Sequence, residues 1–73
     1  MTITIGNRKF TVDLENGTLI TPDGTFDGDI SFGVIENGKG KITSQEPQKG
    51  LYVFVKKNGG TTYVSDQAIT NLT

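Results

Sequence analysis

The 73-residue sequence contains no cysteine, no histidine and no tryptophan. Without cysteine there is no disulfide, no thiolate nucleophile and no cysteine-ligated zinc. Without histidine the chain lacks the most common general base and the most common ligand of transition metals. Apolar residues make up only 33%, and a core in a chain of this size supplies roughly 3–5 kcal/mol unless something reinforces it. Self-association into a homo-oligomer is the reinforcement that these absences leave open.

Long apolar runs and motifs of known catalytic sites are absent as well. No stretch approaches the roughly 20 apolar residues of a membrane-spanning helix. The N-terminal MTITIGNRKF lacks the basic segment and apolar run of a signal peptide. We therefore expect a cytoplasmic protein with no membrane partner, folded as one domain over residues 1–73. Ser31, Ser44 and Ser65 have no histidine to activate them, so we expect no enzymatic activity, no catalytic residues and no cofactor.

Strand and turn signals dominate what is present. The chain has 11 threonines and ten glycines, and no window shows the apolar spacing of an amphipathic helix. Apolar residues alternate with others over residues 10–14, 30–34 and 51–55, and each run is followed by Asn-Gly, at 16–17, 37–38 and 58–59. Asn-Gly favours the type I′ turn of a tight hairpin. The three pairs are spaced 21 residues apart, which indicates a repeated hairpin.

These signals predict an all-β fold, a small antiparallel meander of about six or seven short strands. Gly6-Asn7 is expected to form a fourth tight turn, and the segments PDGTFDG, SQEPQKG and SDQA are expected to be loops between hairpins. The apolar residues of the first hairpin lie one position out of step with those of the other two. That hairpin therefore needs a bulge or faces another way. Whether the sheet stays open or closes into a barrel is left as an alternative.

The stretch from Gly17 to Thr43 resembles a MORN repeat. GTLITPDGTFDG and NGKGKIT match the pattern of this family, with Phe26 and Gly28 in its aromatic-x-Gly positions. The resemblance implies hairpins that form a scaffold for protein or lipid contacts. FTVDLENGTLIT is similar to a strand and turn of small OB barrels, and TTYVSDQAITNL looks like the closing strand of SH3-like barrels.

The charges are segregated along the chain. Residues 13–36 carry six carboxylates and no cation, whereas residues 39–57 carry five lysines and one glutamate. Asp23, Asp27 and Asp29 resemble the start of a calcium loop, but Val34 stands where that loop needs a glutamate. Acidic turn residues are the other interpretation, and we expect no metal site.

The candidate binding site is the segment LYVFVKK and its surroundings. Leu51, Val53 and Val55 alternate with Tyr52 and Phe54, so this strand is either covered on both faces or presents an aromatic face. The candidate site residues share aromatic or basic character; they are Lys41, Tyr52, Phe54, Lys56, Lys57 and Tyr63.

Two functions fit this set of residues. The first is a non-catalytic module that binds a protein partner through a β-sheet surface, because Tyr and Phe are enriched at interfaces. The small size is also typical of inhibitors or structural components of phages and mobile elements. The alternative is a nucleic-acid-binding barrel, in which bases stack on the aromatic rings and lysines contact phosphates.

Overall fold

The computed structural model covers residues 1–73 and contains nine strands. In chain order they are β1 (Thr2–Ile5), β2 (Arg8–Asp13), β3 (Thr18–Thr21), β4 (Gly24–Asp27), β5 (Asp29–Glu36), β6 (Lys39–Ser44), β7 (Tyr52–Lys57), β8 (Gly60–Val64) and β9 (Asn71–Leu72). No part of the backbone forms a helix of the length and apolarity that a membrane crossing requires. The prediction of an all-β antiparallel fold is confirmed. The expected six or seven strands are too few.

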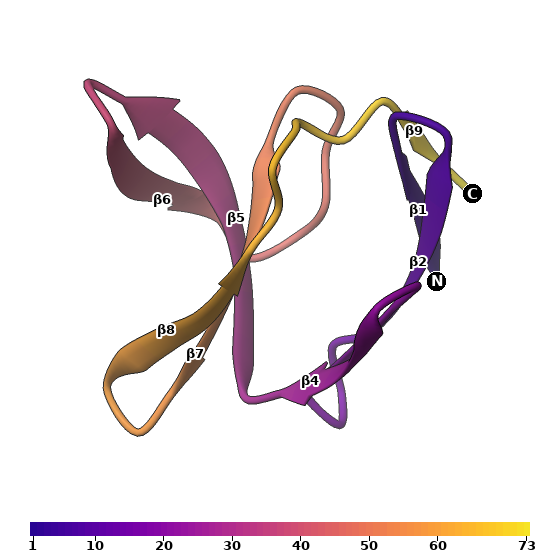
Figure 1. Ribbon diagram of the computed structural model, residues 1–73, viewed down its shortest axis with the longest axis horizontal. Helices are drawn as coiled ribbons and strands as arrows, with labels where there is room; N and C mark the ends of the chain where they lie inside the picture. The colour runs from indigo at the N-terminus through magenta and orange to yellow at the C-terminus, as the bar shows by residue number, and fades with distance from the viewer.

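The strands form two separate sheets. One has the order β4-β3-β2-β1-β9 and the other β6-β5-β7-β8, and every pairing is antiparallel. The chain passes from the first sheet to the second through Gly28 alone, and Figure 1 shows the β5–β6 and β7–β8 hairpins on the side away from β1, β2 and β9. Because the two sheets share no ladder, the alternative of a closed barrel is wrong.

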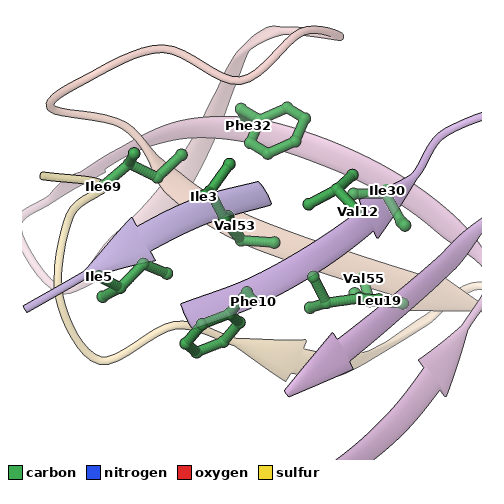
Figure 2. Packing of buried hydrophobic residues seen from close by; sticks show 10 residues of the cluster. All are labelled: Ile3, Ile5, Phe10, Val12, Leu19, Ile30, Phe32, Val53, Val55 and Ile69. Atoms are coloured by element: carbon green, nitrogen blue, oxygen red, sulfur yellow. The ribbon is translucent and has the colours of Figure 1, made fainter. Parts of the chain in front are cut away.

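The core lies between the two sheets (Figure 2). Alternate residues of the strands point inward, as the period of two predicts. The first sheet contributes Ile3, Ile5, Phe10, Val12 and Leu19; the second contributes Ile30, Phe32, Val53 and Val55; and Ile69 enters from the segment before β9. All ten side chains are buried. The alternation expected for residues 10–14, 30–34 and 51–55 therefore supplies most of the core. The exceptions are Leu14, which lies in a loop and is exposed, Val34, which is outside the core cluster, and Leu51, which is only partly buried against it.

Two of the three Asn-Gly pairs form the predicted turn. Asn37 (φ 52°) with Gly38 (φ 78°), and Asn58 (φ 55°) with Gly59 (φ 80°), have the two positive φ angles of type I′. At Asn16-Gly17 the prediction of this turn is wrong, because only Gly17 (φ 67°) is in the left-handed region. A four-residue loop, 14–17, joins β2 to β3 there.

That loop also explains the one-residue offset of the first hairpin. The carboxylate of Asp13 accepts hydrogen bonds from the backbone N–H (3.1 Å) and the side-chain amide (2.8 Å) of Asn16. As a result β2 ends at Asp13, two residues before the end that a type I′ turn at 16–17 would give it. The predicted tight turn at Gly6-Asn7 is confirmed, since β1 and β2 are joined by these two residues alone.

One strand, β4, lies in a segment that the sequence indicated as a connection. β4 occupies most of PDGTFDG, because Pro22 and Asp23 alone make the turn and Thr21 caps it: its hydroxyl donates to Gly24 C=O at 2.9 Å and accepts from Asp23 N–H at 3.0 Å. β9 is only two residues long and pairs with β1.

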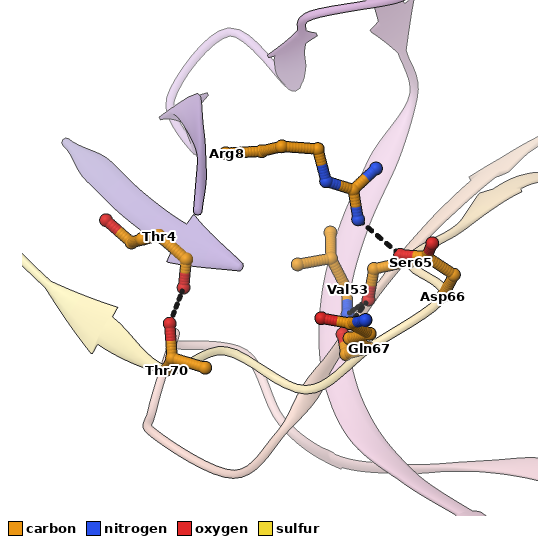
Figure 3. A network of polar contacts seen from close by, with 7 residues as sticks. All are labelled: Thr4, Arg8, Val53, Ser65, Asp66, Gln67 and Thr70. Atoms are coloured by element: carbon orange, nitrogen blue, oxygen red, sulfur yellow. Dashed lines mark hydrogen bonds and ion pairs between the residues drawn. The ribbon is translucent and has the colours of Figure 1, made fainter. Parts of the chain in front are cut away.

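The segment before β9 ties the two sheets together (Figure 3). The hydroxyl of Ser65 accepts from Val53 N–H and donates to Gln67 C=O, both at 3.0 Å. Ile69 N–H donates to the C=O of Leu51, the residue just before β7 of the second sheet, at 2.8 Å. The next residue, Thr70, donates its N–H to Thr4 C=O of the first sheet, also at 2.8 Å.

Candidate functional site

The second sheet has one face turned to the core and one turned away from it. On β7, Val53 and Val55 point into the core, so Tyr52, Phe54 and Lys56 point the other way. Cross-strand pairing places further apolar side chains beside them, since Phe54 is opposite Val64, and Gly33 lies between Tyr52 and Ile42. We call this surface the outer face; its apolar members are Ile35, Ile42, Tyr52, Phe54 and Val64.

Phe54 forms the floor of the outer face. Its side chain is 4% exposed although it is not part of the core between the sheets. The ring lies over Gly40, where an added Cβ would come within 2.6 Å of it. Glycine at position 40 therefore gives the ring its place on the sheet, and the outer face is packed locally without a covering layer.

Around this floor three large apolar side chains remain open to solvent. Ile35 is 40% exposed, Ile42 37% and Val64 40%. A hollow of about 260 Å³ lies between Ile42, Phe54 and Val64. Single exposed apolar residues are ordinary on protein surfaces, but several gathered on one sheet face mark a contact surface.

A second, larger hollow continues from the first. It measures about 720 Å³ and extends from the outer face to the 14–17 loop. Ile42 and Lys56 line both hollows, and Leu14, which is 42% exposed, lines the far side. The carboxylates of Glu15 and Asp29 also border it. The surface thus has an apolar centre with charged groups at its rim.

The predicted site residues do not all share this surface. Tyr52, Phe54 and Lys56 lie on the outer face. Lys41 is opposite Val34 on β5, one position away from Ile42, and so points to the other side of the sheet. Lys57 also points to that side, and its ammonium pairs with the Asp27 carboxylate of β4 at 3.3 Å.

Tyr63 is separated from Phe54 by the whole thickness of the sheet. It is opposite Val55 and packs at the edge of the core, with its ring centroid 4.8 Å from that of Phe26 and 6.2 Å from that of Phe10. Burial raises the pKa of the Tyr63 hydroxyl above its ordinary value. Tyr52 and Phe54 are therefore the only two of the three predicted aromatic rings that the fold brings to one face.

Several other charged side chains are dispersed or engaged in local contacts. Asp23, Asp27 and Asp29 do not gather, and no cluster of three acidic side chains able to hold a metal ion occurs in the fold. Arg8 binds Asp66 at 2.5 Å, and this hydrogen bond raises the pKa of the Arg8 guanidinium (Figure 3). The hydrogen bonds from Asn16 lower the pKa of the Asp13 carboxyl.

Sequence reasoning missed the exposed members of the outer face. Ile35, Ile42 and Val64 lie in three different strands, β5, β6 and β8. Only the sheet order brings them together, because β6 and β8 lie on opposite sides of β5 and β7. A signal was present: each is an aliphatic β-branched residue in a strand that directly follows or precedes an Asn-Gly turn.

Comparisons with protein-family models, with curated proteins and with solved structures found no match to this chain. The structure consists of antiparallel β-hairpins, and no family model confirms the resemblance to MORN repeats or to OB or SH3-like barrels. The candidate site is accordingly defined by its own geometry.

Proposed function

We propose that this chain is a non-catalytic binding module that contacts a partner protein through its outer face. The observation that carries this proposal is the exposure of Ile35, Ile42 and Val64 on the same side of one sheet, at 37–40% each. The exposed parts of these three side chains contribute no burial to the stability of the fold. Covering them would remove apolar surface from water at about 25 cal/mol per Å².

The layout also favours a protein over a nucleic acid. Bases stack on open ring faces, but the ring of Phe54 is covered and Tyr63 packs at the core edge. Lys41 and Lys57, moreover, point away from the outer face. An apolar centre containing aromatic residues, with a charged rim, is the anatomy of a protein–protein interface.

The resemblance of residues 17–43 to a MORN repeat supports the same kind of role, because it implies a scaffold for contacts. An inhibitor or a structural component of a phage or mobile element, acting in the cytoplasm, would work through such a surface. A second copy of the chain is the other partner that this face could accept.

A photo-crosslinking experiment tests the proposal. Ile42 is replaced by p-benzoylphenylalanine, and a matched variant carries the same residue at Ile20, which is 47% exposed on the other sheet. Irradiation in an extract of the source cells should give a discrete protein adduct from position 42. Excess unlabelled protein should compete for it, and position 20 should give none.

Equal adducts from both positions, or no adduct from position 42, would contradict the proposal. An adduct of twice the chain's mass would identify the partner as a second copy.

A further inference from the structure

The strand β6 is an edge of the second sheet that no other part of the fold covers. It pairs with β5 alone, and Figure 1 shows the β5–β6 hairpin extending away from the first sheet. In an antiparallel pair, alternate residues direct their N–H and C=O groups away from the partner strand. Residues 39–43 form no hydrogen bond outside their ladder with β5. Their outward backbone groups are therefore available to another strand.

The other edge strands are shorter, and two of them contact each other through side chains. β4 and β8 approach each other across the sandwich, where the rings of Phe26 and Tyr63 are 4.8 Å apart. Next to them, Asp27 of β4 pairs with Lys57 of β7. At the opposite edge of the first sheet, β9 is only two residues long. β6, with six residues, is the longest edge strand of the two sheets, compared with five residues in β8 and four in β4.

The two sides of β6 differ in chemistry. Lys39 and Lys41 point to one side, opposite Glu36 and Val34 of β5, and neither lysine forms an ion pair. Gly40 and Ile42 point to the other side and belong to the surface around Phe54. The strand therefore presents a basic side and an apolar side along the same free backbone edge.

This charge pattern argues against a second copy at the edge. Two β6 strands paired antiparallel about Gly40 or Lys41 would set lysine against lysine, and like charges directly opposite destabilise a sheet. Lysine on an edge is a common means of preventing such pairing. The same two lysines would stabilise a strand that carries acidic residues at the matching positions.

We propose that an extended segment of a partner protein, with alternating acidic and apolar side chains, adds to β6 as a fifth strand of this sheet. Its acidic residues lie opposite Lys39 and Lys41, and its apolar residues continue the outer face beside Ile42. Backbone hydrogen bonds give affinity for any extended segment, and the alternating acidic and apolar side chains give specificity. This inference rests on the proposed function and names the segment of the partner that is bound.

The test is an NMR titration of the ¹⁵N-labelled protein with a synthetic hexapeptide of alternating Glu and Val, blocked at both ends. Saturable shifts are expected for the amides of residues 39–43. The peptide of alternating Lys and Val should bind at least tenfold more weakly. A Glu-Val peptide with N-methylated valines, which cannot donate to a ladder, should give no shifts.

A charge-reversal variant makes the test specific. Lys39→Glu combined with Lys41→Glu should weaken the Glu-Val peptide about tenfold, since two exposed pairs contribute up to about 1 kcal/mol each, and should favour the Lys-Val peptide instead. Both lysines are exposed and unpaired, so the fold is expected to persist. Lys9→Glu with Lys49→Glu changes the net charge equally and should leave binding unchanged.

The inference would be overturned if the amide shifts appeared at β8 or β9 in place of β6, or if the two peptides bound equally. It would also be overturned if charge reversal left the affinity for the Glu-Val peptide unchanged. Tighter binding of the oligonucleotide (dT)₆ to the same lysines would overturn it too. If crosslinking at Ile42 succeeds while the Glu-Val peptide fails, the proposed function stands without strand addition. If crosslinking at Ile42 fails, the proposed function itself is lost.

Discussion

Gly33 lies closer to the backbone of β6 than any side chain would allow. A Cβ at this position would be 1.9 Å from the carbonyl oxygen of Lys41 and 2.8 Å from Cα of Ile42, beside the irregularity in the β5–β6 ladder. A bulge of this kind inserts an extra residue and bends the strand. The local shape of the outer face therefore depends on a single hydrogen at this residue.

Gly33→Ala should consequently lower the free energy of unfolding by about 1–3 kcal/mol, the cost of forcing atoms into a filled space. Gly60→Ala is the matched control, because its Cβ would meet only the carbonyl of Lys57 at an ordinary 3.8 Å. It should leave stability unchanged or raise it by up to about 1 kcal/mol. Urea unfolding of both variants measures the difference, and equal values would refute the close approach.

Asn16 holds the carboxylate of Asp13 in its charged form. A carboxyl whose pKa is lower in the folded chain than in the unfolded one stabilises the fold above its unfolded pKa, about 4. That contribution is lost as the pH falls through the folded value. Asn16→Ala should therefore raise the pKa of Asp13 toward its ordinary value in a carboxyl-carbon NMR titration. Asn7→Ala, in another turn, should not change it, and a variant pKa equal to that of the wild type would contradict this role for Asn16.

At the scale of strands and turns, an element can be predicted from the sequence when its own residues determine its conformation. The turns at 37–38 and 58–59 are determined by their own residues, because both central positions need a positive φ and Asn-Gly accepts this conformation. The first Asn-Gly pair differs because the Asp13 side chain competes for the backbone and closes a longer loop. β4 was not predicted, because it contains a single apolar side chain, Phe26, and the ring that Phe26 contacts, Tyr63, lies 37 positions further along the chain.

Phe26→Ala tests whether this distant contact holds β4 in place. The side chain is half-buried, so about 2 kcal/mol should be lost, roughly half the cost of deleting a fully buried phenylalanine. The pKa of Tyr63 should fall toward its ordinary value as water reaches the ring. Phe26→Leu should retain most of the stability in thermal or urea unfolding. A change within about 0.5 kcal/mol, with the pKa of Tyr63 unaltered, would show that β4 is not docked there.

At the scale of the whole molecule, the two faces of the second sheet have different roles. Residues of the inner face could be recognised from alternation, since a core between two sheets imposes a period of two. Of the outer face only Tyr52 and Phe54, which share β7, could be recognised, because the other three apolar residues lie on three further strands and join them only through the sheet order. The position of Tyr63 on the inner face likewise depends on the irregular β7–β8 pairing.

Two valines on opposite faces test this division. Val53→Ala, in the core, should cost about 2 kcal/mol or more through lost burial and the cavity left behind. Val64→Ala, at 40% exposure on the outer face, should cost less than about 1 kcal/mol. Urea unfolding monitors both. Comparable losses would mean that the outer face is part of the stabilising core.

The measurement that tests the central claim most directly is the solvent exposure of the methyl groups in dilute solution. A neutral, water-soluble gadolinium chelate broadens the NMR signals of accessible methyls. The signals of Ile35, Ile42 and Val64 should be broadened strongly, and those of Ile3, Val53 and Val55 should be protected. If the methyls of Ile42 and Val64 are as protected as that of Val55, the outer face is already covered, and it is not a surface awaiting a partner.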